Sequence, residues 1–173
     1  MSAALNSAAR AAAPGWWRWL GVSLFVIVAD QAAKAMVLAA LRPGEHIVVT
    51  GFFSLTLAFN PGAAFSFLAA ADGWQRWMFA AIAIAASAVI LWLLKRGGSA
   101  TFCFGLALIL GGALGNLWDR LILGKVVDFL LFHYGGWAYP AFNVADSAIT
   151  VGAALLILDS FRQRRPESGA NDA

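Results

Sequence analysis

The chain has 173 residues, of which 61% are hydrophobic and 12% are charged, and its net charge is +3. Soluble domains carry about 25% charged residues, so this composition excludes an ordinary soluble domain and indicates an integral membrane protein. No basic run is interleaved with aromatic residues as in nucleic-acid-binding segments, so no nucleic-acid partner is predicted. The single cysteine, Cys103, cannot form an intrachain disulfide and is expected to be a buried thiol.

Residues 1–15 are rich in alanine and are expected to form a flexible cytoplasmic tail. Four apolar segments follow, each close to the length of about 20 residues that a membrane-spanning helix needs. The segments are residues 16–41, 77–94, 99–118 and 140–158. The first contains Asp30 and Lys34 and is too long and too charged for a cleaved secretory signal, so we expect a retained span. The pattern predicts a membrane domain over residues 16–162 and a second cytoplasmic tail over 163–173.

The connection between the first two spans, residues 42–76, carries a pattern typical of β-strands. Large apolar residues alternate with smaller ones from Phe53 to Phe59, which is the period of a strand. His46–Thr50 is a second β-rich stretch, and Asn60-Pro61-Gly62 supplies a turn. We therefore expect an all-α membrane protein of four transmembrane helices, with a small outer-face β-sheet between the first and second helices.

The basic residues predict which way the chain crosses the membrane. In the four-span arrangement, seven Lys and Arg residues flank the side that holds the termini, and four flank the other side. Because the cytoplasmic side normally carries the excess of basic residues, both termini are expected in the cytoplasm.

Three polar residues on different spans have nearly the same predicted depth. At about 1.5 Å of rise per residue, Asp30, Asn116 and Asp146 lie roughly 21, 25 and 24 Å from the cytoplasmic ends of their spans. The hydrocarbon core is about 30 Å thick, so all three are expected just beneath the outer surface. An ionisable group at that depth is costly, which makes this polar layer a functional-site hypothesis.

Other polar residues near this layer have both a structural and a functional interpretation. Asp30 and Lys34 are four residues apart on one helix face and are expected to pair. Asn116, Asp119 and Arg120 form a cluster at the expected end of the third span. Either group could serve only to stabilise charges near the membrane interface.

The sequence lacks the motifs of serine hydrolases and zinc hydrolases, which limits the reactions that the polar residues could catalyse. The chain has no Gly-x-Ser-x-Gly and no His-Glu-x-x-His, and its two histidines, His46 and His133, are expected to be surface residues. Two neighbouring carboxylates share a proton, so one can act as general base on water while the other donates to a substrate carbonyl. Such a pair hydrolyses an amide without metal or cofactor. The acids that could form it are Asp30, Asp119, Asp128 (expected in a loop beyond the third span) and Asp146, and these residues leave open which two meet.

Five sequence blocks, in order and with the four-span layout, resemble the bacterial lipoprotein signal peptidases (signal peptidase II), which are membrane aspartyl proteases. The blocks are Asp30-Gln31-x-x-Lys34, Asn60-x-Gly62-Ala63-Ala64-Phe65, Gly112-Ala113-Leu114-Gly115-Asn116-x-x-Asp119-Arg120, Val126-Val127-Asp128-Phe129 and Phe142-Asn143-x-Ala145-Asp146-x-x-Ile149. The resemblance covers roughly residues 17–162, and no motif position departs from the family's pattern.

The resemblance implies an aspartic endopeptidase of the bacterial inner membrane whose active site lies near the outer face. It implies that Asp128 and Asp146 are the catalytic pair and that Asp30 and Lys34 support the site. The residues that it assigns to lining the site and binding the substrate backbone are Asn60, Gly62, Asn116, Arg120 and Asn143. Asp119 is expected to order Arg120 or the end of its helix.

The implied reaction removes the signal peptide of a diacylglyceryl-modified prolipoprotein immediately before the lipidated cysteine. The implied partners are this substrate, membrane lipid and globomycin-type cyclic peptide inhibitors, with no cofactor and no metal. We expect a monomer, because a site that opens sideways to lipid needs no second subunit. A small transporter and a non-enzymatic membrane scaffold are the rival interpretations. A transporter would need a polar path through the inner half of the bundle, yet residues 20–29 and 147–158 carry no charge.

Overall fold

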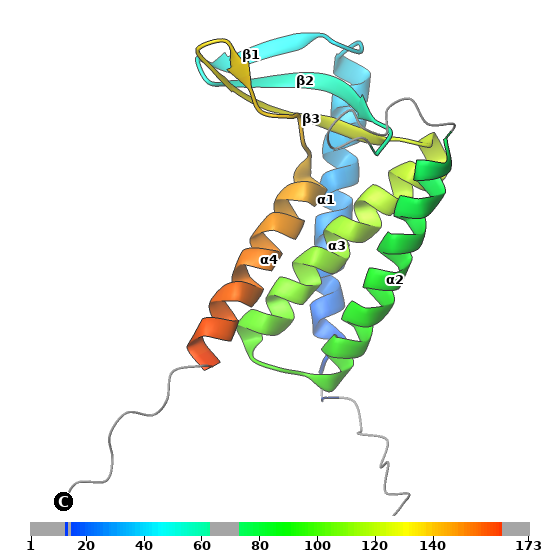
Figure 1. The fold of residues 1–173 in the computed structure, drawn as a ribbon, viewed down its shortest axis with the longest axis vertical. Helices are drawn as coiled ribbons and strands as arrows, with labels where there is room; N and C mark the ends of the chain where they lie inside the picture. The colour runs from blue at the N-terminus through cyan, green and yellow to red at the C-terminus, as the bar shows by residue number, and fades with distance from the viewer. Residues whose placement is uncertain (1–12, 14, 63–72, 164–173) are drawn as a thin grey trace, which may run out of the picture.

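The part of the chain that the structure describes forms four helices and a sheet at one end of them. The computed structural model describes residues 13, 15–62 and 73–163. The elements, in chain order, are α1 (Arg18–Ala40), β1 (His46–Thr50), β2 (Phe53–Asn60), α2 (Trp74–Arg96), α3 (Ala100–Leu123), β3 (Val126–Tyr134), β4 (Trp137–Ala138) and α4 (Val144–Gln163). The sheet lies across one end of the helices, while α1 begins and α4 ends at the opposite end (Figure 1). All four helices are long and apolar enough to span a membrane, which confirms the predicted fold class.

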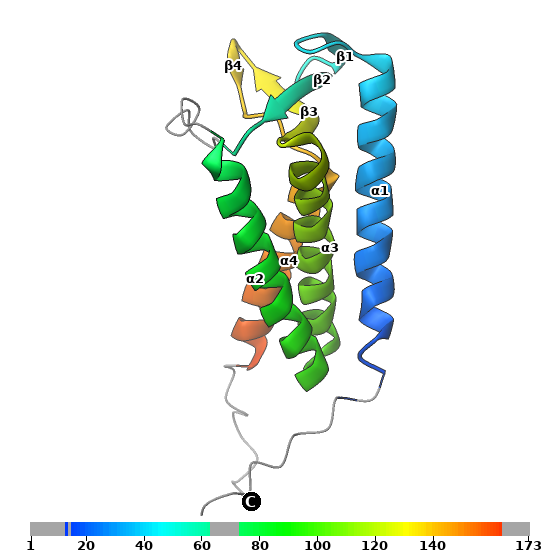
Figure 2. The ribbon, with the colours of Figure 1, turned by 90° about the vertical axis from the view of Figure 1, so that its right-hand side faces the viewer.

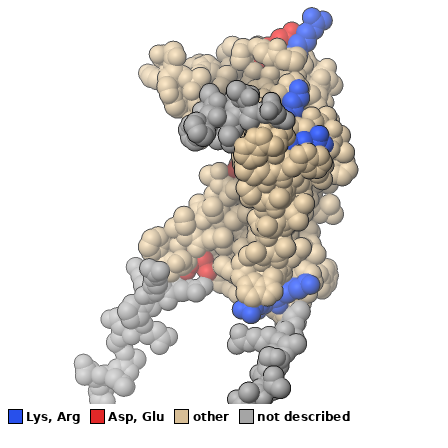
Figure 3. All heavy atoms as spheres, turned by 45° about the vertical axis from the view of Figure 1, so that its right-hand side comes forward, with Lys and Arg blue, Asp and Glu red and all other residues tan. Residues whose placement is uncertain are grey.

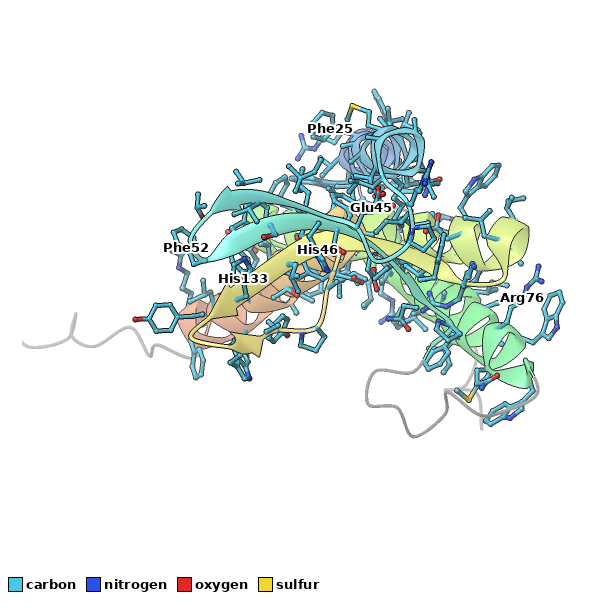
Figure 4. The ribbon with its side chains drawn as sticks, turned by 90° about the horizontal axis from the view of Figure 1, so that it is seen from above. Phe25, Glu45, His46, Phe52, Arg76 and His133 are labelled. Carbon is cyan, nitrogen blue, oxygen red and sulfur yellow. The ribbon has the colours of Figure 1, made fainter. Side chains whose placement is uncertain are left out.

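The surface agrees with a membrane environment. On the face shown in Figure 3, basic side chains lie towards both ends, and the band of surface between them is almost free of charge. Large apolar side chains are exposed along the helices, among them Phe25, Ile84 and Val151. Seen from above the sheet, Phe25 points away from the bundle (Figure 4). A soluble monomer rarely exposes an apolar surface of this extent, so the chain is a multi-pass membrane protein.

Helix α3 is the centre of the bundle and packs against α1, α2 and α4 (Figure 2). Two glycines on α3 make its close contacts possible. A Cβ atom on Gly111 would lie 2.7 Å from the backbone oxygen of Ser23 in α1, and one on Gly112 would collide with the backbone oxygen of Ala145 in α4. The close helix packing brings polar side chains of three helices within hydrogen-bonding distance.

The ends of α3 explain where its polar residues lie. Ser99 caps the helix, since its side chain accepts a hydrogen bond from the N–H of Phe102. Gly124, with a φ of 77°, ends the helix after Leu123. The predicted end of this span at Trp118 is therefore too early. Asp119 and Arg120 belong to the helix itself and continue its buried face towards the sheet.

The sheet has four antiparallel strands in the order β1-β2-β3-β4. Its first two strands are the ones predicted from the alternating pattern. The prediction that Asp128 lies in a loop is wrong, because Asp128 lies in β3, opposite Ala58 of β2. The pattern of β3 was missed because its first four residues are all buried, so apolar and polar positions do not alternate. Val37 of α1 packs beneath the strands against Leu57 and Val127.

We expect Gly112→Ala to lower the free energy of unfolding by about 1–3 kcal/mol, a typical cost of overpacking. The added methyl group would meet a backbone oxygen of α4, which cannot give way unless the helix shifts. Gly21→Ala in α1 is the matched control, since a Cβ atom there meets nothing within 4 Å and alanine favours the helix. Thermal unfolding of both variants in detergent measures the difference. Equal melting temperatures would contradict the close α3–α4 contact.

Candidate active site

Two carboxylates, Asp128 of β3 and Asp146 of α4, are held in one site by two asparagines. Asn143 Nδ2 donates a hydrogen bond to Asp128 Oδ1 at 2.7 Å, and Asn116 Nδ2 donates to Asp146 Oδ1 at 2.7 Å. The amides also contact each other, since Asn143 Nδ2 lies 3.1 Å from Asn116 Oδ1. The structure thus joins these two acids through a short chain of amides, although they come from different elements.

Asn143 organises the start of α4 as well as the site. It immediately precedes the helix, and its Oδ1 accepts a hydrogen bond from the backbone N–H of Asp146 at 2.8 Å. This is the bond that an N-terminal cap makes. Its Nδ2 also lies 3.2 Å from the backbone oxygen of Val127, beside Asp128. One side chain therefore fixes the position of both carboxylates relative to each other.

The two acids differ in exposure. Asp128 is 2% exposed, whereas Asp146 is half-buried. The pKa of Asp128 is raised from 3.8 to about 7, chiefly by burial and then by the charge of Asp146. Hydrogen bonds from Asn60 and Asn143 and the charge of Lys34 oppose the rise. Asp128 therefore exchanges its proton near neutral pH, which is the range that general acid–base catalysis requires.

A groove of about 360 Å³ leads along α4 to Asp146. Its walls are aromatic at the end nearest the sheet and carry hydroxyl and aliphatic groups further along the helix. The lining residues are Tyr139, Phe142, Asp146, Ser147, Thr150 and Val151. Asp146 is the only acid among them, and the more deeply buried Asp128 is not part of the lining.

Arg120 lies at the edge of the site with an unused donor. Its Nη1 lies 3.3 Å from the backbone oxygen of Asn116, and its guanidinium stands over the ring of Phe79 at 5.2 Å. Its Nε is buried and has no hydrogen-bond partner among the residues that the structure describes. This N–H is available to an oxygen atom of a bound molecule.

The end of β2 completes the site on the side of the sheet. Asn60 contributes a hydrogen bond to Asp128, and its Oδ1 accepts the backbone N–H of Gly62 at 2.8 Å. Gly62 has a φ of +109°, and a Cβ atom there would lie 2.6 Å from the ring of Phe79. The positive φ favours glycine, and a larger residue would also have to displace this ring. The rest of this block, residues 63–65, lies outside the described part of the chain.

A buried ion-pair network lies behind the two acids. Lys34 Nζ is 2.7 Å from Asp30 Oδ2, 2.8 Å from Asp119 Oδ2 and 3.0 Å from Asn116 Oδ1. The predicted Asp30–Lys34 pair is confirmed. The described hydrogen bonds of Asp119 go to Lys34, Gln31 and the backbone of Val127. None goes to Arg120, which was one of the two roles expected for Asp119. The part played by Gln31 was not predicted, although its position beside Asp30 was part of the motif.

The two histidines lie away from these acids. His46 is exposed in β1, and His133 lies on the sheet near Phe52, with Nε2 2.8 Å from Ser54 Oγ (Figure 4). Within the described ranges, no three His, Cys, Asp or Glu residues are grouped so that they could hold a metal ion. Cys103 is buried and unpaired, as predicted.

Comparison with known proteins links this site to one family. The family model described as "Signal peptidase (SPase) II" matches residues 22–162. A lipoprotein signal peptidase of Ralstonia nicotianae is 57% identical over 148 residues, which cover 85% of this chain and 86% of the relative. One of Burkholderia mallei is 60% identical over 148 residues, covering 85% and 89%.

Solved structures show the same fold. A bacterial membrane enzyme determined by the in meso method at 2.3 Å resolution superposes with a TM-score of 0.79 and 26% identity, covering 93% of this chain and 99% of that structure. A second such enzyme, determined at 1.9 Å, gives a TM-score of 0.75 and 27% identity, with coverages of 86% and 94%.

Proposed function

The chain belongs to the signal peptidase II family, and from this premise we propose that Asp128 and Asp146 are its catalytic pair. The protein is a membrane peptidase of the aspartic type that removes signal peptides from prolipoproteins. The observation that carries the proposal is the pair of asparagine amides that hold the two carboxylates in one site, one buried and one opening on a groove.

The two acids share the work of hydrolysis. With one proton between them, the ionised carboxylate takes a proton from water, and the water oxygen attacks the carbonyl carbon of the scissile amide. The protonated carboxyl donates its proton to the carbonyl oxygen. When the tetrahedral intermediate collapses, the amide nitrogen leaves with a proton from the pair. Because the two groups titrate together, the proton belongs to the pair and not to one residue.

The other residues of the site orient the pair and the substrate. The amides of Asn116 and Asn143 are already committed to the two carboxylates, so we assign them to holding the acids as well as lining the site. Arg120 has a buried N–H without a partner among the described residues, which suits a substrate carbonyl oxygen. Asn60 and Gly62 lie at the end of β2, where Asn60 bonds to Asp128 and to the backbone of Gly62. We propose that these residues hold the substrate backbone with its bond before the lipidated cysteine at the two acids.

The groove on α4 is the place where lipid and inhibitor would bind. Its aromatic and aliphatic walls suit the apolar parts of a diacylglyceryl-modified substrate or of membrane lipid. A globomycin-type cyclic peptide would occupy the same groove and block Asp146. A site that opens sideways into lipid needs no second subunit, so we propose a monomer. Competition between globomycin and the substrate tests the shared groove, and inhibition that excess substrate does not relieve would contradict it.

We propose that the sheet faces the outer side of the inner membrane and that both termini are cytoplasmic. Lys95, Arg96 and Arg162 lie at the helix ends opposite the sheet, where the positive-inside bias places basic residues. A phosphatase domain that is active only outside the cytoplasm should stay inactive when fused after Ala173 and become active when inserted at Gly135. The reverse pattern would overturn this orientation.

The rate of cleavage is expected to fall as the pH rises through about 7. The pKa of Asp128 is raised to about 7, so the pair keeps its one proton below that pH and loses it above. The pair then holds two charges and has no proton to donate to the substrate carbonyl. Measuring kcat between about pH 5.5 and 9 tests this expectation. A kcat that stays constant or rises across the alkaline range would contradict the assigned role of Asp128.

A further inference from the structure

A buried triad of charges joins α1 to α3 behind the two acids. Lys34 bridges Asp30 at 2.7 Å and Asp119 at 2.8 Å, and the three side chains are 2%, 0% and 2% exposed. Desolvation of buried charges offsets much of their attraction, so a buried ion pair is weak evidence of a contribution to stability. The role of the triad is better inferred from the backbone groups that its two carboxylates hold in place.

Each carboxylate of the triad uses an oxygen atom to hold a backbone N–H next to a catalytic acid. Asp30 Oδ1 accepts the N–H of Ala145 at 2.9 Å, and Ala145 precedes Asp146. Asp119 Oδ2 accepts the N–H of Val127 at 3.1 Å, and Val127 precedes Asp128. The two anchoring bonds therefore reach two different elements, α4 and β3, from one lysine-centred triad.

Gln31 bonds to both carboxylates of the triad. Its Nε2 lies 3.2 Å from Asp30 Oδ2 and 2.9 Å from Asp119 Oδ1. Lys34 makes a third connection to the site. It donates to Asn116 Oδ1 at 3.0 Å, and Asn116 Nδ2 donates to Asp146. The space for this arrangement depends on Gly115, where a Cβ atom would lie 2.9 Å from Asp30 Oδ2. The positions of both catalytic acids therefore depend on hydrogen bonds and ion pairs that meet at Lys34 of α1.

We propose that Lys34 is a positioning residue for both catalytic acids, and that it acts through Asp30 on Asp146 and through Asp119 on Asp128. The inference rests on the proposed catalytic pair. A misplacement of about 1 Å at a reacting group can lower the rate about 100-fold. A network that sets the separation of the two acids therefore acts on kcat rather than on substrate binding. Asp119 thereby has a part in the active site rather than at the end of its helix.

The test compares Lys34→Met and Gln31→Met with Ser23→Ala in the purified full-length protein. Ser23 is the matched control because its buried Oγ also joins α1 to α3, donating to the backbone oxygen of Ala107 at 2.8 Å. With a diacylglyceryl-modified prolipoprotein as substrate, we expect Lys34→Met to lower kcat about 100-fold with KM unchanged within about twofold. Gln31→Met leaves the charges balanced and should fold; a kcat loss of about tenfold is expected, again without a change in KM. Ser23→Ala should lower the melting temperature and leave kcat unchanged.

Several results would overturn this role. One is a folded Lys34→Met variant with wild-type kcat. Another is a Ser23→Ala variant that has the same melting temperature as the other variants and loses as much kcat as they do. If Lys34→Met does not fold, Gln31→Met decides, and wild-type kcat in that variant overturns the proposal. Asp128→Asn and Asp146→Asn are measured in the same series. Full activity in these two would show that the catalytic pair itself is wrong, whereas their inactivity beside an active Gln31→Met would refute only the positioning role.

Discussion

Asp128→Asn is expected to lower kcat for prolipoprotein cleavage by at least about 1,000-fold, and Asp146→Asn should do the same. In both variants the amide oxygen can still accept the hydrogen bond from its asparagine partner, so the shape of the site is kept. What is lost is the group that exchanges a proton with water or with the substrate carbonyl. Cleavage is measured by the gel shift of the substrate, and folding by thermal unfolding in detergent.

Asp159→Asn is the matched control for this pair of variants. Asp159 is a buried acid on the same helix as Asp146, but it lies at the other end of α4, where it accepts a hydrogen bond from Ser99 Oγ. We expect this variant to retain wild-type kcat. The double variant of Asp128 and Asp146 should be no less active than either single variant, because residues that act as a unit are not additive. Turnover retained in both single variants would refute the pair.

The second large effect is expected at Asn143, where Asn143→Ala should lower kcat about 100-fold and also destabilise the protein by about 1 kcal/mol. The loss of activity follows because Asp128 loses its hydrogen bond at 2.7 Å and is no longer fixed relative to Asp146. The loss of stability follows because α4 loses the cap on the N–H of Asp146. Steady-state kinetics and thermal unfolding measure the two effects separately.

Asn143→Ser separates the two roles of this side chain. Serine is among the best helix caps, so the bond to the N–H of Asp146 is expected to persist and the stability to recover. Its hydroxyl is too short to replace the amide nitrogen that reaches Asp128, so kcat should stay as low as in Asn143→Ala. A serine variant with restored activity would show that Asn143 matters only for starting the helix.

Much of the fold could be predicted from the sequence because the physics of the membrane is simple. Long apolar segments must be helices, and a rise of about 1.5 Å per residue brings Asp30, Asn116 and Asp146 to one depth. The structure confirms the common level, since Asp30 bonds to the backbone beside Asp146 and Asn116 bonds to Asp146 itself. Depth along a helix can be read from spacing alone, whereas the direction of a side chain around it depends on packing.

The parts that were missed depend on contacts between distant segments. Asp128 looked like a loop acid because strand β3 pairs with β2, more than sixty residues earlier in the chain, and its local pattern does not alternate. The backbone anchors on Val127 and Ala145 leave no mark in the sequence, since any residue but proline supplies an N–H. For the same reason Asp119 could be placed near Arg120 by spacing, while its bond to β3 could not be foreseen.

We propose that this protein cleaves prolipoproteins with two aspartates and without a metal. The most direct measurement is the mass of both products after the purified wild-type protein has cleaved a diacylglyceryl-modified prolipoprotein in detergent with a chelator present throughout. We predict undiminished cleavage and a mature product whose first residue is the lipidated cysteine. Cleavage that stops with the chelator and returns with added metal would contradict metal-free catalysis, and a cut at another peptide bond would contradict cleavage before the lipidated cysteine.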